Sequence, residues 1–163
     1  MVNSEETQYV CGMRKEDFQT TIDGRETDLY VLRNARGNEV AITNYGGAIV
    51  AIMVPDRDGN LANVIQGHDN IQDVISSPEP YLSTLIGRYG NRIARGRFQL
   101  NGKEYRIAVN NGPNALHGGK KGFNAKVWDA VQVNDHAVVL KYTSPYGEEG
   151  FTGEVEVWVA YSF

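Results

Sequence analysis

From residue 29 onward, short hydrophobic runs alternate with clusters of turn-forming residues. Residues 29–33 and 39–43 flank a segment with two asparagines and a glycine, which predicts a β-hairpin. Residues 48–54 form a continuous apolar run that a proline closes, as expected of a strand buried on both faces. A turn over 56–60 and a short return strand over 62–65 follow.

Two further hairpins are predicted in the second half of the chain. The clearer one covers 97–109, because apolar and polar side chains alternate on both sides of Asn101-Gly102, a pair that favours a tight turn. The other joins residues 126–133 to residues 137–142.

The last apolar run and one short helix complete the pattern. Only residues 70–77 predict a helix, with Asn70 as its N-cap. Residues 154–161 predict a final strand that places four apolar side chains on one face: Val155, Val157, Val159 and Tyr161.

The fold class that follows is all-β, a β-sandwich. Residues 1–28 are polar and weakly patterned, and we expect them to form a loosely held N-terminal arm. Residues 29–163 end directly after a strong strand, and sheet edges need pairing or protection. We therefore expect these residues to be the N-terminal portion of a single larger β-sandwich domain, truncated here. An unpaired last strand would also let copies of the chain self-associate through this edge.

Composition supports one globular domain and excludes several classes of protein. The 163 residues include 18 glycines, which fits a turn-rich all-β chain. Sixteen basic against 20 acidic side chains give a net charge of −4, which argues against a nucleic-acid partner. No apolar run approaches the length of about 18 residues that a membrane helix needs, so no membrane partner is expected.

The cysteine content and the N-terminus point to a cytoplasmic location. Cys11 is the only cysteine, so it cannot form a disulfide within the chain. The first 13 residues lack the basic and apolar regions of a signal peptide. A periplasmic or secreted location would apply if a leader had been removed before this numbering starts.

Two candidate chemistries find little support. The three histidines are far apart in the sequence: His68, His117 and His136. The chain has a single cysteine, so no spacing typical of metal ligands is present and no metal is expected. Glu148 and Glu149 could serve as the carboxylate pair of a glycosidase. Adjacent residues of an extended chain point in opposite directions, however, and flanking glycines favour a turn.

Two segments are richer in groups that contact polar ligands. Residues 87–98 contain four arginines, and Asn91 lies beside Arg92; arginine offers a planar set of donors for hydroxyl, carboxylate or phosphate oxygens. Residues 110–123 place His117 in a glycine-dense loop between two strands. The alternative interpretation is that the arginines solvate a sheet edge and that the histidine is inert.

At these residues the chain resembles the aldose 1-epimerase (galactose mutarotase) family. The blocks that carry the resemblance follow the family's order and together extend over residues 29–161. They are TNYGGAIVAIMVPDRDG (43–59), IGRYGNRIARGRFQLNGKEYRI (86–107), NNGPNALHGGKKGF (110–123), VWDA (127–130) and SPYGEEGFTG (144–153).

The resemblance implies a β-supersandwich of the galactose mutarotase-like type and interconversion of the α and β anomers of free aldohexoses, without a cofactor. Carried over residue by residue, the sugar contacts would be Asn91, Arg92 and His117. The family's catalytic acid, a histidine in an Asn-His motif, and its base, a glutamate near the end of a longer chain, have no counterpart here. We therefore assign no catalytic residue and expect little or no epimerase activity from this chain alone.

Other functions stay open at this point. A hexose-6-phosphate 1-epimerase of the same superfamily would use Arg88, Arg95 or Arg97 to meet a phosphate. A non-catalytic carbohydrate-binding module would need only the sugar contacts, and a purely structural sandwich would need none of them. The long LHGG-containing match favours a neutral sugar over a sugar phosphate.

Overall fold

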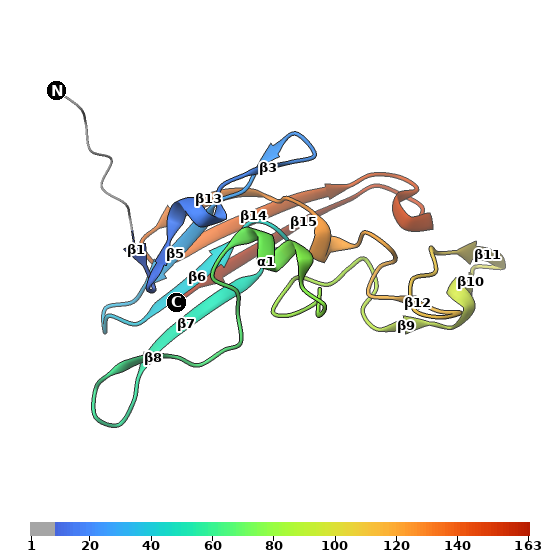
Figure 1. The fold of residues 1–163 in the computed structure, drawn as a ribbon. Helices are drawn as coiled ribbons and strands as arrows, with labels where there is room; N and C mark the ends of the chain where they lie inside the picture. The colour runs from blue at the N-terminus through green and yellow to red at the C-terminus, as the bar shows by residue number, and fades with distance from the viewer. Residues whose placement is uncertain (1–8) are drawn as a thin grey trace.

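The computed structural model describes residues 9–163, which form an antiparallel β-sandwich with short helices on one outer face (Figure 1). One sheet has four strands in the order β5 (Leu29–Arg33), β6 (Glu39–Thr43), β7 (Ile49–Pro55) and β8 (Leu61–Asn63). The other sheet has three strands in the order β13 (Asp129–Asn134), β14 (Ala137–Ser144) and β15 (Val155–Ser162). All neighbouring strands in both sheets are antiparallel.

The two sheets share a hydrophobic core that also contains three packed aromatic rings. Trp128 is 1% exposed, and its ring centroid lies 5.5 Å from the centroids of both Phe123 and Tyr142. Ring pairs in this geometry add to the stabilisation that burial provides. The aliphatic side chains of this core come from both sheets: Leu32, Val40, Ile42, Val138 and Leu140, flanked by Val157 and Val159.

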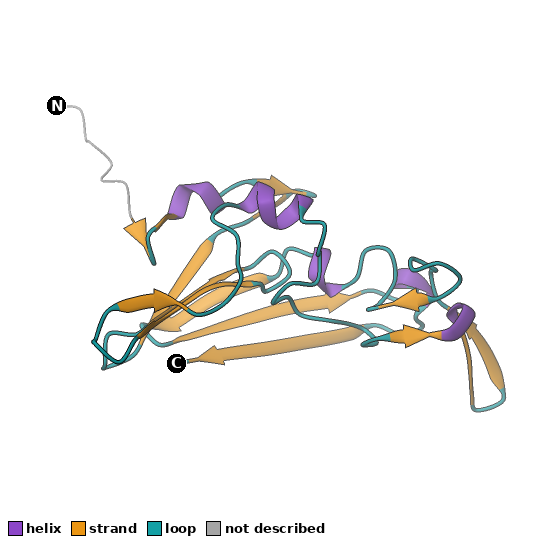
Figure 2. Cartoon of the chain, turned by 60° about the horizontal axis from the view of Figure 1, so that its bottom comes forward, coloured by secondary structure: helices purple, strands orange, loops and turns teal. Residues whose placement is uncertain are grey.

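A second core lies on the opposite face of the four-stranded sheet, which Figure 2 shows covered by helical turns. Helix α1 (Ile71–Ser76) contributes Ile71 and Val74, and the 3-10 helix η1 (Lys15–Phe18) contributes the fully buried Phe18. Asn70 caps α1, because its side chain accepts a hydrogen bond from the backbone N–H of Asp73. The predicted helix and its cap are thereby confirmed.

The N-terminal segment differs from the prediction. Over residues 9–28 it is not a loosely held arm: Phe18 is fully buried, and the buried Thr27 hydroxyl donates a hydrogen bond to the Phe18 carbonyl at 2.7 Å. A few well-placed apolar residues reach the core although the surrounding sequence is polar. Residues 1–8 of the predicted arm lie outside the described residues.

Most predicted strands are confirmed, several with their bounds. β5 and β6 begin and end at the predicted residues. The hairpin predicted over 97–109 is present with the turn at Asn101-Gly102, but its second strand ends at Arg106. In β7, Val50 and Ala51 face one core while Ile49 and Ile52 face the other, so both faces are buried over the first four residues. In β15 three of the four predicted apolar side chains pack on the core, whereas Val155 is 40% exposed.

At one end of the sandwich, residues 88–122 extend away from the two sheets, and we call this part the distal segment (Figure 1). Between 88 and 116 only Gly96, Ile107 and Ala115 are buried. The distal segment contains β9 (Arg92–Ile93), η2 (Ala94–Gly96), β10 (Arg97–Leu100), β11 (Lys103–Arg106) and β12 (Ala115–Leu116), and η3 (Phe123–Ala125) follows.

The remaining elements are short. They are β1 (Tyr9–Val10), β2 (Met13–Arg14), β3 (Thr21–Ile22), β4 (Arg25–Glu26) and η4 (Glu148–Gly150). Among residues 9–163, no helix is long and apolar enough to cross a membrane.

Candidate functional site

The three predicted sugar contacts lie together in the distal segment. β9 pairs antiparallel with β12, and this register sets Arg92 opposite Leu116. Asn91 immediately precedes β9 and His117 immediately follows β12, so the two residues face each other at the end of the ladder. Asn91, Arg92 and His117 are therefore neighbours although 26 positions separate the first from the last.

Asn91 and His117 are joined by two hydrogen bonds. The His117 backbone N–H donates to the Asn91 carbonyl at 3.1 Å, and the Asn91 backbone N–H donates to the His117 ring atom Nδ1 at 2.9 Å. Both residues adopt left-handed backbone conformations, with φ of 64° for Asn91 and 52° for His117. This conformation is uncommon outside glycine. It turns both strand ends away from the β9–β12 pair, so that the Asn91 backbone N–H can donate to the imidazole ring.

The glycine after His117 is required by close packing of two backbones. A Cβ atom at Gly118 would lie 1.8 Å from the Gly87 carbonyl oxygen, and Gly118 has a φ of +94°. No other residue type fits such an approach without displacing the backbone. The glycine-dense loop predicted from the sequence therefore packs directly against the segment that leads to Asn91 and Arg92.

Arg92 lies on the exposed side of this pair. Its Nε donates to the Asn111 side-chain oxygen at 3.0 Å, and its Nη1 donates to the Asn91 side-chain oxygen at 3.4 Å. The two amide oxygens hold the guanidinium group between Asn91 and Asn111 while leaving further N–H groups to serve as donors. Arg92 also lines a hollow of about 350 Å³ with Tyr89, Ile93, Phe98 and Phe151.

Two residues that sequence reasoning did not assign hold the His117 loop in place. The Asn110 amide donates to the carbonyls of Leu116 at 2.9 Å and Gly119 at 2.8 Å, and it accepts from the Leu116 N–H at 2.6 Å. The Tyr81 ring meets the His117 ring edge-on with centroids 4.6 Å apart. The sequence offers no periodic signal for either role, because both depend on contacts between loops.

The four arginines of residues 87–98 have different surroundings. Arg88 is bound by protein groups: its guanidinium donates to the Ser144 side chain at 2.8 Å and to the carbonyls of Ser144, Pro145, Thr152 and Gly153 at 2.7–3.2 Å. These five bonds use every N–H that the group offers, so Arg88 joins two loops and is not available to a ligand. The side chains of Arg95 and Arg97 are exposed outside the Asn91–His117 pair.

Glu148 is part of a polar cluster beside the aromatic core. Its carboxylate accepts from the Tyr142 hydroxyl at 2.6 Å and from the Ser144 hydroxyl, and it lies 2.5 Å from the Lys126 ammonium group. Burial alone would raise the pKa of Glu148, but the bonds from Lys126, Ser144 and Tyr142 outweigh burial and lower it. Burial, together with the Glu148 carboxylate, raises the pKa of the Tyr142 hydroxyl.

Glu149 points to a different neighbourhood. Its carboxylate accepts from the Lys120 backbone N–H at 2.6 Å, and its carbonyl accepts from the Ala108 N–H at 2.8 Å. A Cβ at Gly119 would lie only 2.3 Å from the Glu149 carboxylate. Glu148 and Glu149 therefore stabilise two separate places, and the geometry does not favour a glycosidase pair.

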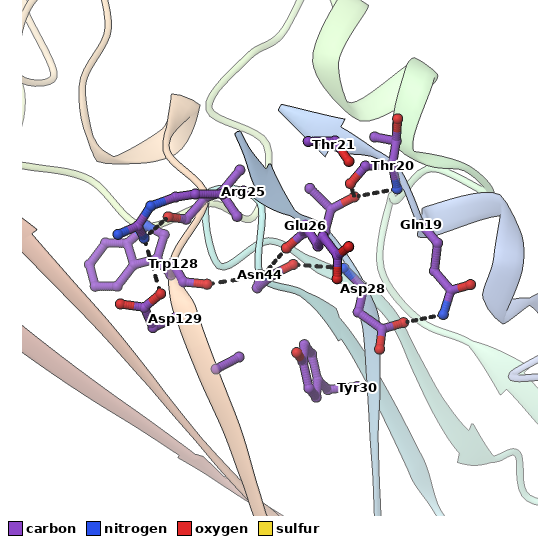
Figure 3. A pocket seen from close by; sticks show the side chains of 13 residues that line it. Gln19, Thr20, Thr21, Arg25, Glu26, Asp28, Tyr30, Asn44, Trp128 and Asp129 are labelled. Carbon is purple, nitrogen blue, oxygen red and sulfur yellow. Dashed lines mark hydrogen bonds and ion pairs between the residues drawn. The ribbon is translucent and has the colours of Figure 1, made fainter. Parts of the chain in front are cut away.

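Another cavity, of about 760 Å³, lies elsewhere, between the N-terminal segment and the start of β13 (Figure 3). Its polar groups bind one another: the Asn44 amide donates to the Trp128 carbonyl and accepts from the Asp28 N–H, and Arg25 donates to Asp129 at 3.2 Å. None of the three predicted sugar contacts lines this cavity. It is a polar seam between the two sheets, whereas the donors described above lie at the distal end.

The distal arrangement offers hydrogen-bond donors to the oxygen atoms of a polar ligand. A guanidinium group and an imidazole ring are held by protein hydrogen bonds on one exposed surface, next to a hollow with aromatic walls. Donors held in place before a ligand arrives bind oxygen atoms without a reorganisation cost.

The chain matches known proteins over most of its length. The family model described as aldose 1-epimerase matches residues 28–163. Galactose mutarotase of Bos taurus is 45% identical over 123 residues, which cover 76% of this chain and 35% of that protein. Aldose 1-epimerase of Escherichia coli strain K12 is 33% identical over 145 residues, which cover 85% of this chain and 40% of that protein. The chain thus spans between a third and two fifths of the length of these curated relatives.

Solved structures share the fold. An aldose epimerase homologue from C. elegans superposes with a TM-score of 0.78 at 24% identity, over 83% of this chain and 42% of that chain. Galactose 1-epimerase from Lactobacillus acidophilus superposes with a TM-score of 0.75 at 23% identity, over 86% of this chain and 41% of that chain. The expected all-β sandwich of this structural type is thereby confirmed.

Proposed function

This chain belongs to the aldose 1-epimerase family, and on that basis we propose that it serves the interconversion of the α and β anomers of a free aldohexose such as galactose or glucose. The observation that carries the proposal is that Asn91 is hydrogen-bonded both to Arg92 and to His117, the other two predicted sugar contacts. Asn91, Arg92 and His117 form one hydrogen-bonded group that presents donors to solvent. The relatives named above are a galactose mutarotase and an aldose 1-epimerase, which supports the same substrate class.

The chemistry of the reaction sets what each group can do. Opening the sugar ring requires a proton delivered to the ring oxygen and a proton removed from the anomeric hydroxyl. The Arg92 guanidinium group would bind hydroxyl oxygens and stabilise negative charge that develops on them. His117 would contribute a further hydrogen bond, and Asn91 a short polar side chain.

We further propose that residues 1–163 alone bind the sugar but accelerate mutarotation little or not at all. Of the three contacts, only His117 is a residue type that commonly transfers protons in enzymes. One such group cannot act at the ring oxygen and at the anomeric hydroxyl simultaneously. Glu148 is held by Lys126 and by two hydroxyl groups, which argues against its use as the second group.

Polarimetry of freshly dissolved α-D-galactose tests both parts when it is combined with calorimetric titration of the sugar. We expect a measurable dissociation constant for the wild type, a loss of affinity of about tenfold or more in Arg92→Ala, and a rotation decay close to that of buffer. Arg97→Ala is the matched control, since it removes an exposed arginine of the same segment. An acceleration that disappears in His117→Ala would contradict the claim of low activity, and absence of binding would contradict the proposed function.

A non-catalytic carbohydrate-binding role is the second candidate, because the described residues supply sugar contacts without an acid and base pair. It predicts binding of both anomers with no change in the rate of mutarotation. A hexose 6-phosphate substrate is less well supported, since Arg88 is occupied by protein groups. Competition between galactose and glucose 6-phosphate in the same titration separates these substrates.

Two other expectations stay predictions. The outer edge of β15 carries no partner strand among the described residues, which supports self-association of copies through this strand. Light scattering that shows only a monomer would contradict it. A cytoplasmic location is supported by Cys11, the single cysteine, which is a free thiol.

A further inference from the structure

One nitrogen of the His117 ring is hydrogen-bonded to the protein, and the other has no hydrogen-bond partner among the described residues. Nδ1 accepts a hydrogen bond from the Asn91 backbone N–H at 2.9 Å. An accepting nitrogen carries no proton, and a neutral imidazole carries its single proton on the other nitrogen. Among residues 9–163 no group accepts a hydrogen bond from Nε2, so the geometry leaves an Nε2–H donor for an external oxygen.

The backbone on both sides of His117 is held by one side chain. Asn110 binds Leu116, the residue before His117, through both its amide oxygen and its amide nitrogen. The same amide nitrogen donates to the carbonyl of Gly119, two residues after His117. A single asparagine thus closes the loop around His117 and fixes the position of its backbone.

Tyr81 connects this loop to the ring itself. Its hydroxyl accepts from the Asn110 amide at 3.2 Å, while its ring meets the imidazole edge-on with centroids 4.6 Å apart. Tyr81 and Asn110 therefore restrict the ring and the backbone of the same histidine from two sides. Both are partly buried, so their contacts are shielded from water.

We propose that Asn110, assisted by Tyr81, is a positioning residue that holds His117 as the Nε2–H tautomer and directs this donor to a sugar hydroxyl or ring oxygen. The identity of the acceptor rests on the proposed function, whereas the tautomer and the roles of Asn110 and Tyr81 do not. In this arrangement His117 acts on a ligand as a hydrogen-bond donor, and Asn91 contributes through its backbone amide as well as its side chain.

Nitrogen-15 NMR of the imidazole rings tests the tautomer directly. The spectrum is recorded on labelled residues 1–163 at about pH 8, where an ordinary imidazole is neutral, and His117→Gln assigns the signals. We expect Nε2 to be protonated and Nδ1 to be unprotonated. A spectrum with the proton on Nδ1 overturns the proposal.

Two variants test the positioning roles. Asn110→Asp retains an acceptor for the Leu116 N–H but removes the donor to the Leu116 and Gly119 carbonyls, so we expect a mixture of His117 tautomers and about tenfold weaker galactose binding. Tyr81→Phe removes only the hydroxyl group, and we expect about threefold weaker binding with the tautomer largely kept. It provides the readout if Asn110→Asp does not fold.

The control is Asn34→Ala, which removes another loop asparagine. The Asn34 oxygen accepts two backbone N–H groups, from Arg36 and Asn38, within the loop that joins β5 to β6. We expect this control to leave the His117 signals and galactose affinity at wild-type values. Wild-type tautomer and affinity in both Asn110→Asp and Tyr81→Phe overturn the proposal. Absence of galactose binding by the wild type overturns the proposed function instead, and the NMR result still decides the positioning role.

Discussion

The sandwich and the distal segment are held together by different forces. In the sandwich, the two cores consist mainly of buried aliphatic and aromatic side chains on regular strands. In the distal segment between 88 and 116, only three residues are buried, and amide side chains and glycine contacts fix the loops. Burial of apolar area dominates stability, whereas oriented polar groups recognise ligands. The molecule thus keeps its stability and its candidate site in separate regions.

The strongest test of this division is removal of the largest buried ring. Trp128→Ala should lower the free energy of unfolding by about 3–5 kcal/mol, because it leaves a cavity between Phe123 and Tyr142. Urea unfolding followed by circular dichroism measures the change. Trp158→Ala is the matched control, since Trp158 is 61% exposed on β15 and should cost less than about 1 kcal/mol. Similar losses in both variants would contradict the division.

Arg88 lies where the two regions meet and should give an intermediate effect. Lysine keeps the charge but cannot donate five hydrogen bonds in a plane, so Arg88→Lys should cost about 2 kcal/mol. Urea unfolding measures this loss, with the exposed Arg97→Lys as control. Because Gly87 packs under Gly118, galactose affinity should fall in the same variant. An unchanged free energy of unfolding in Arg88→Lys would show that the loops beside the site keep their structure without the Arg88 hydrogen bonds.

The smallest effect is expected from titration of Glu148. Its pKa is lowered in the folded state, so its contribution to stability is present above the unfolded pKa near 4.5 and is lost as the pH falls through the folded value. The free energy of unfolding should therefore fall on acidification below about pH 4.5, and less steeply in Glu148→Gln.

Urea unfolding at several pH values measures this slope. Glu156→Gln is the comparator: hydrogen bonds from Lys141 and Trp158 lower the pKa of Glu156, but its carboxylate is exposed on β15. Solvent weakens such exposed pairs, so its effect on the slope should be smaller. An equal effect of the two substitutions on the slope would contradict the claim that the partly buried Glu148 cluster contributes more to stability than an exposed ion pair.

The sequence predicts the sandwich better than the site because the two depend on patterns of different range. Alternation of apolar residues is local, so β5 and β6 could be predicted with their bounds and α1 from the cap at Asn70. Phe18 has no periodic neighbours, and its burial follows only from tertiary packing. The same limit explains why residues 9–28 were predicted to be loosely held.

In the candidate site, residue type alone cannot distinguish two identical side chains that have different structural roles. Arg88 and Arg92 carry the same side chain four positions apart, yet one is enclosed by carbonyl groups and the other is exposed beside Asn91. Family resemblance selected Arg92 from the motif, and the structure shows why Arg88 differs. Asn110 lies in a motif that the sequence singled out, but its bonds depend on how the loop folds back.

The left-handed backbone at Asn91 has a consequence for how this site can vary. Because the bond to the His117 ring comes from the backbone N–H, the side chain at position 91 can change without removing it. A φ of 64° nevertheless restricts that position to the few residues that tolerate it, chiefly asparagine, aspartate and glycine. Substitutions tolerated at this position would therefore leave an amide, a carboxylate or no side chain next to His117. Position 91 would thus have three discrete forms, all of which keep the backbone hydrogen bond that orients the imidazole ring.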